Sequence, residues 1–331
     1  MLLSIIVPIC NVAPYLEKCL QSIQTQSFKD FECIMVDDGS IDDSRQIAQS
    51  FCDQDDRFKL IASEHGGLAH AQNLALKEVK GEYITFCDGD DYLSAGAYEN
   101  VLPIIEKKPD LIISNLYFEY ADQTRRNSAY KLPNLTNREQ IVNHFPEIYK
   151  QQMMYYDTNK IYHKSILRDL KFENLTVGLD TVLNYEVFAR CNNIYFSEKP
   201  YYHYLQRQGS LVNHFDAQRL MIREYETQSL VQLLAHWNPE YASQLINLDW
   251  YNTLTNTVKN VYAFDEHNQL LKPKQRIYYL KNDLKVCLQH MRVSLLSDEQ
   301  RAFIDEVKSV VAAGDDQEFI QRFASSNLYS E

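Results

Sequence analysis

The chain has 331 residues, of which 45% are apolar and 24% charged, a balance typical of a soluble globular protein with one large domain or two ordinary ones. Lysine and arginine number 33 against 45 aspartates and glutamates, so the formal net charge is −12. This acidic total argues against a general nucleic-acid binder and against a polybasic membrane anchor, because both need clustered positive charge. No apolar stretch approaches the ~20 residues of a membrane-spanning helix, so no transmembrane segment is expected.

Seven cysteines, an odd number, are spread along the chain without a C-x-x-C pair. This usage predicts reduced, buried thiols rather than a disulfide framework or a zinc site. The apolar start, MLLSIIVPIC, is too short to span a membrane and lacks the basic segment of a signal peptide. We therefore expect a cytoplasmic protein, either free in the cytosol or peripheral at the inner face of the membrane.

The first 115 residues or so alternate apolar runs with helical patterns. Stripes with helical spacing include Leu16 with Leu20, Ile47 with Phe51, and Leu68 to Val79. Between them lie five runs typical of buried strands, namely Leu3–Ile9, Glu32–Val36, Phe58–Ala62, Tyr83–Cys87 and Asp110–Ser114. The alternation predicts an α/β fold with a mostly parallel, Rossmann-like sheet and helices on both faces. The ligand site of such a sheet lies at the carboxyl ends of its strands.

The second part of the chain has a different pattern. Residues 118–120 and 129–131 could pair as a hairpin or form a loop, and the segment Thr136 to Glu139 is typical of a capping box at the start of a helix. Three further elements are expected: a helix over Asp180–Cys191, and short strands over Ile194–Phe196 and Tyr201–Leu205.

Nearly everything after Asp216 has helical spacing. The expected helices are Asp216–His236, Glu240–Phe264, Lys274–Met291 and Asp298–Val311. We therefore predict an α/β region over residues 1–214 and an α-helical C-terminal domain over 215–331. These helices could pack on the rest of the chain, form a homo-oligomer or dock a partner.

Polar and acidic residues follow three of the predicted strands. The first strand runs into Pro8–Asn11, the second ends in Asp37–Ser40, and the fourth ends in Asp88–Asp91. Clustered carboxylates repel one another, and a hard divalent ion such as Mg²⁺ or Mn²⁺ relieves that repulsion. Either acidic segment alone is also an ordinary turn sequence. Because both follow buried strands, together they predict a metal–nucleotide site at one edge of the sheet.

The same motifs, in this order, resemble those of the family 2 glycosyltransferases. The resemblance is carried by Ser4–Asn11, Tyr15–Ile23, Val36–Ser40 and Gly81–Asp91, the last of which contains a D-x-D motif. It covers residues 3–115 strongly and 155–212 more weakly. It implies a GT-A fold, an inverting transfer, a UDP-sugar donor, Mn²⁺ or Mg²⁺ as cofactor, and a glycan acceptor on a lipid or a protein. Residues 1–115 would then bind the nucleotide-sugar, and residues 116–214 would form the acceptor side.

The resemblance also implies roles for individual residues. Asp38 falls where the family holds the uracil ring, Asp88 where it holds the ribose, and Asp90 where it holds the metal. Pro8 and Cys10 fall where the base is lined. The implied donor-binding set is Pro8, Cys10, Asn11, Asp38, Gln72, Asp88 and Arg207, and the implied metal ligands are Asp90 and Asp88.

An inverting transfer needs a base that removes the proton from the acceptor hydroxyl. Val177–Asn184 resembles the family's G-E-D segment, and Asp180 falls on the residue that serves as base. An aspartate of ordinary pKa is already ionised at neutral pH and can accept that proton. The alternative interpretation is that Asp180 simply caps the helix that follows.

Several positions depart from the family pattern. Cys10 replaces a usual tyrosine, Gln72 a frequent arginine and Leu179 a usual glutamate. Arg207 stands where a histidine often completes the metal shell. Arginine cannot ligate a metal, but its fork suits a diphosphate.

The acceptor side leaves more interpretations open. His203 could be a metal ligand or simply alternate into a half-buried strand. Asn159–Lys164 resembles a segment near the acceptor, or is an exposed helix start.

Two other functions are compatible with parts of the pattern. The departures leave open a non-catalytic assembly module with a vestigial nucleotide-sugar site. The D-x-D after a strand also occurs in haloacid-dehalogenase-like phosphohydrolases. Those enzymes usually carry threonine or valine where Tyr92 stands, and they place the motif near the start of the chain.

Overall fold

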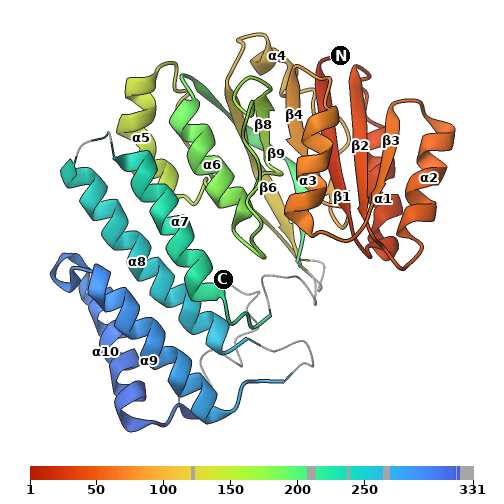
Figure 1. Cartoon of the computed structure of the whole chain (residues 1–331). Helices are drawn as coiled ribbons and strands as arrows, with labels where there is room; N and C mark the ends of the chain where they lie inside the picture. Colours follow the sequence, from red (N-terminus) through yellow and green to blue (C-terminus); the bar gives the residue numbers. More distant parts are fainter. Residues whose placement is uncertain are drawn as a thin grey trace. The chain divides into compact units, whose positions relative to one another are not determined.

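The computed structural model describes residues 1–120, 124–206, 214–235, 237, 239–263, 269–317 and 319–320 (Figure 1). The chain forms two compact units, Met1–Gln206 and Arg207–Glu331, which we call the N-terminal unit and the C-terminal unit. The helical pattern of the sequence predicts the boundary slightly later, after residue 214.

The N-terminal unit is built on one mixed sheet. Within the described residues the order of its nine strands is β3-β2-β1-β4-β8-β6-β9-β5, and β7 pairs with β6. The strands are β1 (Leu3–Ile9), β2 (Phe31–Asp38), β3 (Phe58–Ser63), β4 (Tyr83–Phe86), β5 (Tyr92–Leu93), β6 (Leu111–Glu119), β7 (Arg125–Asn127), β8 (Lys160–His163) and β9 (Ile194–Leu205). Strands β1 to β4 are parallel to one another. Strand β8 is antiparallel to both β4 and β6, and β9 runs parallel to β6.

Helices cover both faces of this sheet (Figure 1). They are α1 (Ala13–Gln24), α2 (Ser44–Gln54), α3 (Leu68–Glu78), α4 (Leu102–Ile105), α5 (Arg138–Lys150) and α6 (Leu179–Arg190). On one face, alternate β1 residues such as Ile5 and Val7 pack with Leu16 and Leu20 of α1 in a single buried core. Helix α3 packs on β1 and β2 without joining that core, because its buried side is turned to the other face. The α/β fold with helices on both faces is confirmed.

The predicted strands of the first part are all present, the first with the predicted bounds and the others with ends shifted by one to five residues. The two short strands predicted after residue 194 form one irregular strand, β9. The predicted hairpin exists as β6 and β7, but its second strand is Arg125–Asn127 rather than residues 129–131.

The predicted capping box is replaced by a cap one residue later, in which the return bond goes to the residue before the cap. Asn137 caps α5 by accepting a hydrogen bond from the backbone N–H of Gln140 at 2.9 Å. The side chain of Gln140 accepts from the N–H of Thr136 at 2.8 Å. Gln140 therefore takes the place predicted for Glu139, because the asparagine at the next position supplies the better-placed cap oxygen.

Strand β8 is the main element that the sequence does not reveal. Its residues Lys160–His163 pair with β4 on one side and β6 on the other, so the segment lies inside the sheet. The interpretation of Asn159–Lys164 as an exposed helix start is wrong. Four residues that include a lysine and a histidine carry no strand pattern, and pairing on both sides decides their structure.

The C-terminal unit is helical, as predicted. It contains α7 (Arg219–Leu234), α8 (Pro239–Val261), α9 (Pro273–His290) and α10 (Asp298–Ala313), with a short 3₁₀ turn over Val293–Leu295. Its core includes Leu254, Leu280 and Ile304. A buried ion pair joins Arg276 Nε to Asp316 Oδ2 at 2.6 Å. Among the described residues, no helix has both the length and the apolarity that crossing a membrane requires.

Candidate active site

The carboxyl ends of β1, β2 and β4 meet at one edge of the sheet. Ile9 at the end of β1 is in register with Asp37 at the end of β2. A Cβ atom placed on Gly89 would lie 3.1 Å from the carbonyl oxygen of Pro8 and 3.0 Å from the side chain of Val12. The loop after β4 therefore passes directly over the end of β1, and glycine permits this approach. The predicted edge brings Pro8 and the D-x-D segment together.

Asp38 is held by the loop that follows β3. The side chain is only 2% exposed, and its two oxygens accept hydrogen bonds from the N–H groups of Gly66 and Gly67, each at 2.8 Å. His65 Nδ1 lies 2.8 Å from Asp38 Oδ2. These loop residues were not predicted to belong to the site. The rule used for the other strands could have found them, because β3 ends at Ser63 in the same parallel sheet.

Cys10 and Asn11 lie on the solvent side of the same edge. The Cys10 thiol lies 3.6 Å from the carbonyl oxygen of Asp38. Asn11 has a left-handed backbone with φ 52°, and its N–H donates to Ser40 Oγ at 3.1 Å. Its side-chain oxygen accepts from the N–H of Ile41 at 2.9 Å. Asn11 therefore ties the loop after β1 to the loop after β2.

The expectation that all seven cysteines are buried is wrong for two of them. All seven are free thiols, but Cys10 is exposed and Cys52 is half-buried. Cys10 is exposed because it comes one residue after the end of β1, where the sheet no longer covers it.

The D-x-D segment gathers three carboxylates. Asp88, Asp90 and Asp91 each offer an oxygen within 4.8 Å of the others. Asp91 is buried and accepts from Tyr202 Oη at 2.6 Å and from the N–H of Leu205 at 2.7 Å, which fastens the loop to β9. Burial, followed by the charges of Asp157, Asp91, Asp90 and Asp180, raises the pKa of Asp88 well above its ordinary value. All-oxygen carboxylate donors in mutual repulsion suit a hard divalent cation.

Asp180 lies in the first turn of α6, near the D-x-D carboxylates. Its Oδ2 accepts from the N–H of Tyr156 at 2.7 Å, and its Oδ1 accepts from the N–H of Thr181 at 2.8 Å. The N-cap of the helix is Gly178, with φ 74°, so the interpretation of Asp180 as the cap is wrong. The glycine adopts the left-handed backbone that other residues avoid, and the helix begins directly after it, at Leu179, one residue before Asp180.

A fully buried lysine supports the segment that contacts Asp180. Lys160 Nζ donates to the carbonyl oxygens of Tyr155 (2.7 Å) and Tyr156 and to Asn159 Oδ1 (3.0 Å). Three acceptors match the three donors of an ammonium group. Burial lowers the pKa of Lys160 to about 7, against the opposing effect of the Asp180 and Asp157 carboxylates. Tyr156 itself has a left-handed backbone with φ 61°.

Asp157 links this segment to α3. Gln72 Nε2 donates to Asp157 Oδ2 at 2.7 Å, and both side chains are buried. Burial and the charge of Asp180 raise the pKa of Asp157 to about 7. The sequence suggested neither Asp157 nor a buried role for Lys160, because pairing with distant strands buries them.

His203 has both ring nitrogens engaged. Nε2 lies 2.8 Å from Ser94 Oγ and Nδ1 lies 2.8 Å from Glu119 Oε1. Its ring stacks against Tyr92 and Tyr117, with centroid distances of 4.2 and 4.7 Å. Of the two interpretations of His203, the structure favours the buried strand position over a metal ligand. Arg207 lies outside the described residues.

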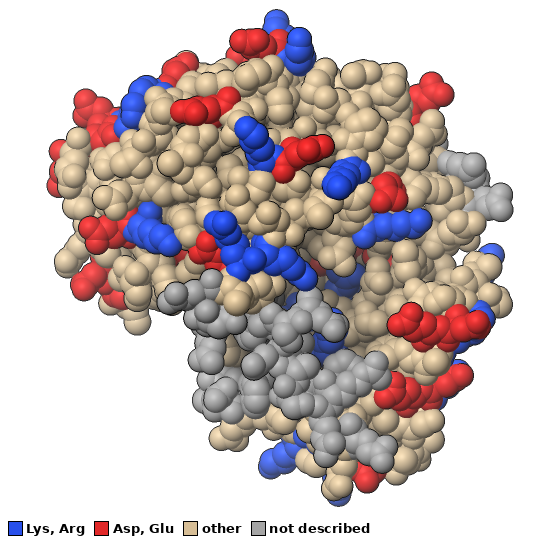
Figure 2. Space-filling view, turned by 180° about the vertical axis from the view of Figure 1, so that it is seen from behind, with Lys and Arg blue, Asp and Glu red and all other residues tan. Residues whose placement is uncertain are grey.

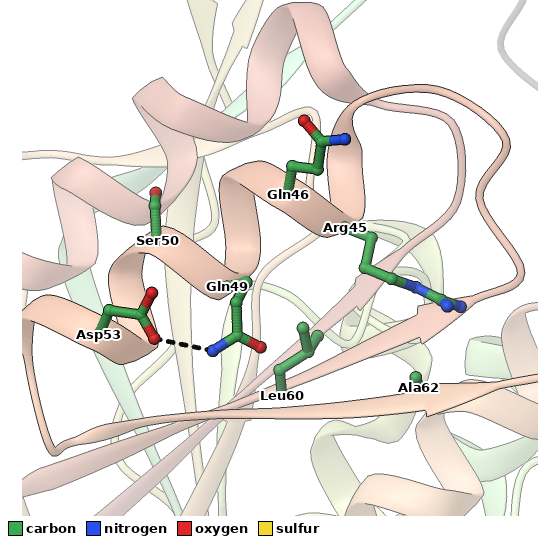
Figure 3. A pocket seen from close by; sticks show the side chains of 7 residues that line it. All are labelled: Arg45, Gln46, Gln49, Ser50, Asp53, Leu60 and Ala62. Atoms are coloured by element: carbon green, nitrogen blue, oxygen red, sulfur yellow. Dashed lines mark hydrogen bonds between the residues drawn. The ribbon is translucent and has the colours of Figure 1, made fainter.

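None of the carboxylates described above lines either of two open hollows of the N-terminal unit. One, of about 500 Å³, is lined by Arg45, Gln46, Gln49, Ser50, Asp53, Leu60 and Ala62 (Figure 3). The other, of about 570 Å³, is lined by residues of α3, β4 and the segment 163–170. The candidate site is therefore defined by the geometry of its side chains and not by either hollow. On the face in Figure 2, acidic side chains lie among the lysines and arginines.

Comparison with known proteins decides the family. Residues 4–171, slightly more than half of the chain, match the sequence profile described as glycosyl transferase family 2. The chain belongs to this family. The resemblance seen in the strand-end motifs is confirmed.

The chain covers less than two thirds of the length of the first curated relatives, 31% of one and 62% of another. Glycosyltransferase GlyA of Streptococcus pneumoniae is 31% identical over 218 residues, which are 63% of this chain and 31% of GlyA. Among solved structures, S. aureus TarS 1-349 in complex with UDP-GlcNAc has a TM-score of 0.69 at 19% identity, covering 95% of this chain and 89% of that one. The mannosyltransferase PcManGT from Pyrobaculum calidifontis, in complex with GDP-Man and Mn2+, has a TM-score of 0.52 at 14% identity, covering 99% and 84%. These structural likenesses show the GT-A fold.

Proposed function

We propose that this protein is an inverting glycosyltransferase that moves a sugar from a UDP-sugar to a glycan acceptor on a lipid or a protein. The observation that carries the proposal is the cluster of Asp88, Asp90 and Asp91 at the ends of the strands, with one oxygen of each within 4.8 Å of the others. The charge of Asp180 reaches this cluster, because it contributes to the raised pKa of Asp88. A base and a donor-diphosphate site must lie on either side of one sugar, and this edge holds candidates for both. The proposal is also supported by the family and by the complex of TarS with UDP-GlcNAc.

The donor's base would lie at the ends of β1 and β2. Pro8, Cys10 and Asn11 would line it, and Asp38 would accept the uracil N–H. A carboxylate has about four acceptor positions. The loop after β3 occupies part of that capacity through two backbone N–H groups. These bonds fix the direction of the carboxylate before a nucleotide arrives.

Asp90 and Asp88 would hold Mn²⁺ or Mg²⁺, and Asp88 would also face the ribose. The donor set fits such an ion, since it consists of carboxylate oxygens within 4.8 Å of one another. When bound, the ion neutralises the charge that develops on the leaving diphosphate. Asp91 instead holds the loop after β4 against β9, through the hydrogen bonds that it accepts from Tyr202 and Leu205.

Asp180 would accept the proton of the acceptor hydroxyl as that oxygen attacks the sugar. Two backbone N–H groups orient its carboxylate and leave it acceptor capacity for a hydroxyl. The half-buried rings of Phe118, Tyr156 and Tyr204 pack together beside it, with centroids 5.5 to 6.1 Å apart. Aromatic faces of this kind suit the apolar faces of an acceptor sugar.

The test is calorimetric titration of UDP into the full chain with Mn²⁺ and with EDTA. We expect binding that EDTA weakens at least tenfold, and a loss of this metal dependence in Asp90→Asn. Asp53→Asn is the matched control, because Asp53 lies in the last turn of α2, bonds to Gln49 and lines the hollow of Figure 3, so its replacement should leave binding unchanged. Absence of UDP binding under both conditions would overturn the proposal in favour of a non-catalytic assembly module.

A further inference from the structure

Three side chains of different chemistry converge where β1, β2 and the loop after β3 meet. Cys10 Sγ lies 3.9 Å from His65 Nδ1, and His65 Nδ1 lies 2.8 Å from Asp38 Oδ2. One ligand atom from each of the three lies within 4.8 Å of the others. Cys10 and His65 are exposed, whereas Asp38 is buried. The cluster is therefore open to solvent on the side of Cys10 and His65, and Asp38 anchors it to the sheet.

A thiolate, an imidazole and a carboxylate are the ligand types of Zn²⁺ and related ions. Bond lengths of about 2.0 to 2.3 Å around a tetrahedral ion place neighbouring ligand atoms roughly 3.3 to 3.8 Å apart. Two of the three observed separations, 3.9 and 2.8 Å, differ from that range by up to about half an ångström, and the third, between Cys10 and Asp38, is within 4.8 Å. Small rotations of the two exposed side chains would close the difference.

The backbone holds this arrangement in place. Both Asp38 oxygens are oriented by the N–H groups of Gly66 and Gly67. Gly39 has φ +70°, and a Cβ atom there would lie 2.9 Å from the backbone nitrogen of His65. Only glycine lets the loop that carries His65 pass so close to the end of β2. Such outer contacts orient the ligands of a metal and raise its affinity.

The cluster differs in kind from the D-x-D group. Asp88, Asp90 and Asp91 offer oxygen atoms alone, which suit Mg²⁺ or Mn²⁺. Cys10 and His65 add sulfur and nitrogen, which favour softer ions. The absence of C-x-x-C spacing hid the cluster from the sequence, because its members come from three separate strand ends.

We propose that Cys10, Asp38 and His65 form a binding site for a thiophilic divalent ion such as Zn²⁺, with three protein ligands and a fourth position open to water. Binding releases the thiol proton to solvent and forms the sulfur–metal bond without any change in oxidation state. Cys10 and Asp38 are also the residues proposed to contact the uracil ring. This consequence rests on the proposed function: because the ion and the uracil ring would use the same two residues, the ion and UDP exclude each other.

Cobalt(II) is the probe, titrated into the reduced full chain without chelators. We expect a thiolate-to-cobalt band in the near ultraviolet that saturates at one equivalent and disappears when Zn²⁺ is added. Cys10→Ser should abolish the band, and His65→Ala should weaken cobalt binding at least tenfold. Cys52→Ser is the matched control, because Cys52 is the other cysteine that is not fully buried, and this variant should keep the band. A missing band, or a band that persists in Cys10→Ser, overturns the site.

A competition titration separates this site from the proposed function. UDP added to the cobalt-loaded protein should reduce the band. If the band forms with the expected variant pattern and UDP binds without reducing it, the metal site stands and the assignment of the base pocket is wrong. If UDP binds normally and no band forms, the donor site stands and the metal site is wrong.

Discussion

The backbone N–H of Tyr156 donates to the carboxylate of Asp180 across 2.7 Å, and Tyr156 has a left-handed backbone with φ 61°. The segment before β8 thus takes an unfavourable conformation at the point where it orients the proposed base. Lys160 stabilises that conformation from beneath through the carbonyl oxygens of Tyr155 and Tyr156. Strained backbone of this kind persists only where its surroundings fix it.

Replacing Asp180 with asparagine should remove the base and leave the donor site intact. We expect sugar transfer to fall by at least a factor of about 100, since general bases contribute roughly that much or more. UDP affinity should stay within twofold of wild type. Glu186→Gln is the control, because Glu186 lies on the exposed side of the same helix. Normal turnover by Asp180→Asn would show that another group takes the proton.

Replacing Lys160 with methionine should lower both stability and turnover. It leaves the carbonyl oxygen of Tyr155 and Asn159 Oδ1 without the bond from Lys160, while the carbonyl oxygen of Tyr156 keeps a bond from Asn184 Nδ2 at 3.2 Å. It also removes a buried amine from the vicinity of Asp157 and Asp180. We expect the free energy of unfolding to fall by about 3 kcal/mol.

Kinetics separate a positioning role of Lys160 from a purely structural one. In the folded fraction of Lys160→Met, kcat should fall while UDP affinity is retained. Lys164→Met is the control, since Lys164 is exposed and its side chain donates only to the carbonyl oxygen of Val79 among the bonds described. Equal kcat in Lys160→Met and wild type would remove the positioning role.

Asp157 should make stability fall as the pH rises from about 4 to about 7. Its pKa is about 7 in the folded protein, so folding takes up a proton over this interval, and the unfolded state is favoured as protons become scarce. The loss amounts to at most about 4 kcal/mol. The asparagine of Asp157→Asn does not titrate. The difference in free energy of unfolding between this variant and wild type should therefore shift in favour of the variant as the pH rises over this range. Denaturant unfolding at pH 5 and pH 8 measures both. Parallel curves for the two proteins would contradict the assignment.

A methyl group on Gly39 should disturb the proposed UDP-binding site at the ends of β1 and β2. Gly39→Ala places a Cβ 2.9 Å from the backbone nitrogen of His65 at φ +70°. The conformation alone costs about 1 to 2 kcal/mol, and displacement of the loop should weaken UDP binding. Gly314→Ala is the matched control, because Gly314 has φ +66° but nothing within 4 Å of a Cβ. It should show the strain without any change in UDP binding. Equal UDP affinities in the two variants would contradict the proposed base pocket.

The sequence predicts the parallel half of the sheet well, because each strand there is a mostly apolar run that ends near a polar turn. Strand β1 has the predicted bounds, Leu3–Ile9. The same regularity predicts that the acids after β2 and β4 lie at one edge, since parallel strands end on the same side.

The second half of the sheet is far less readable. Lys160 and Asp157 are buried charges whose setting comes from strands distant in the sequence, and no local pattern announces them. His65 follows β3, an edge strand in which Phe58 alone is buried, and attention to acidic motifs alone misses a histidine there. Asp180 was found by resemblance rather than by pattern, because an aspartate near a helix start is common for structural reasons.

The most direct test of the central claim is donor hydrolysis across a panel of UDP-sugars and other nucleotide-sugars, measured with Mn²⁺ and with EDTA. We predict slow cleavage of one UDP-sugar, only in the presence of metal, and its loss in Asp90→Asn. Failure to bind or cleave any nucleotide-sugar, or cleavage that EDTA leaves unchanged, would contradict a metal-dependent glycosyltransferase at this edge of the sheet.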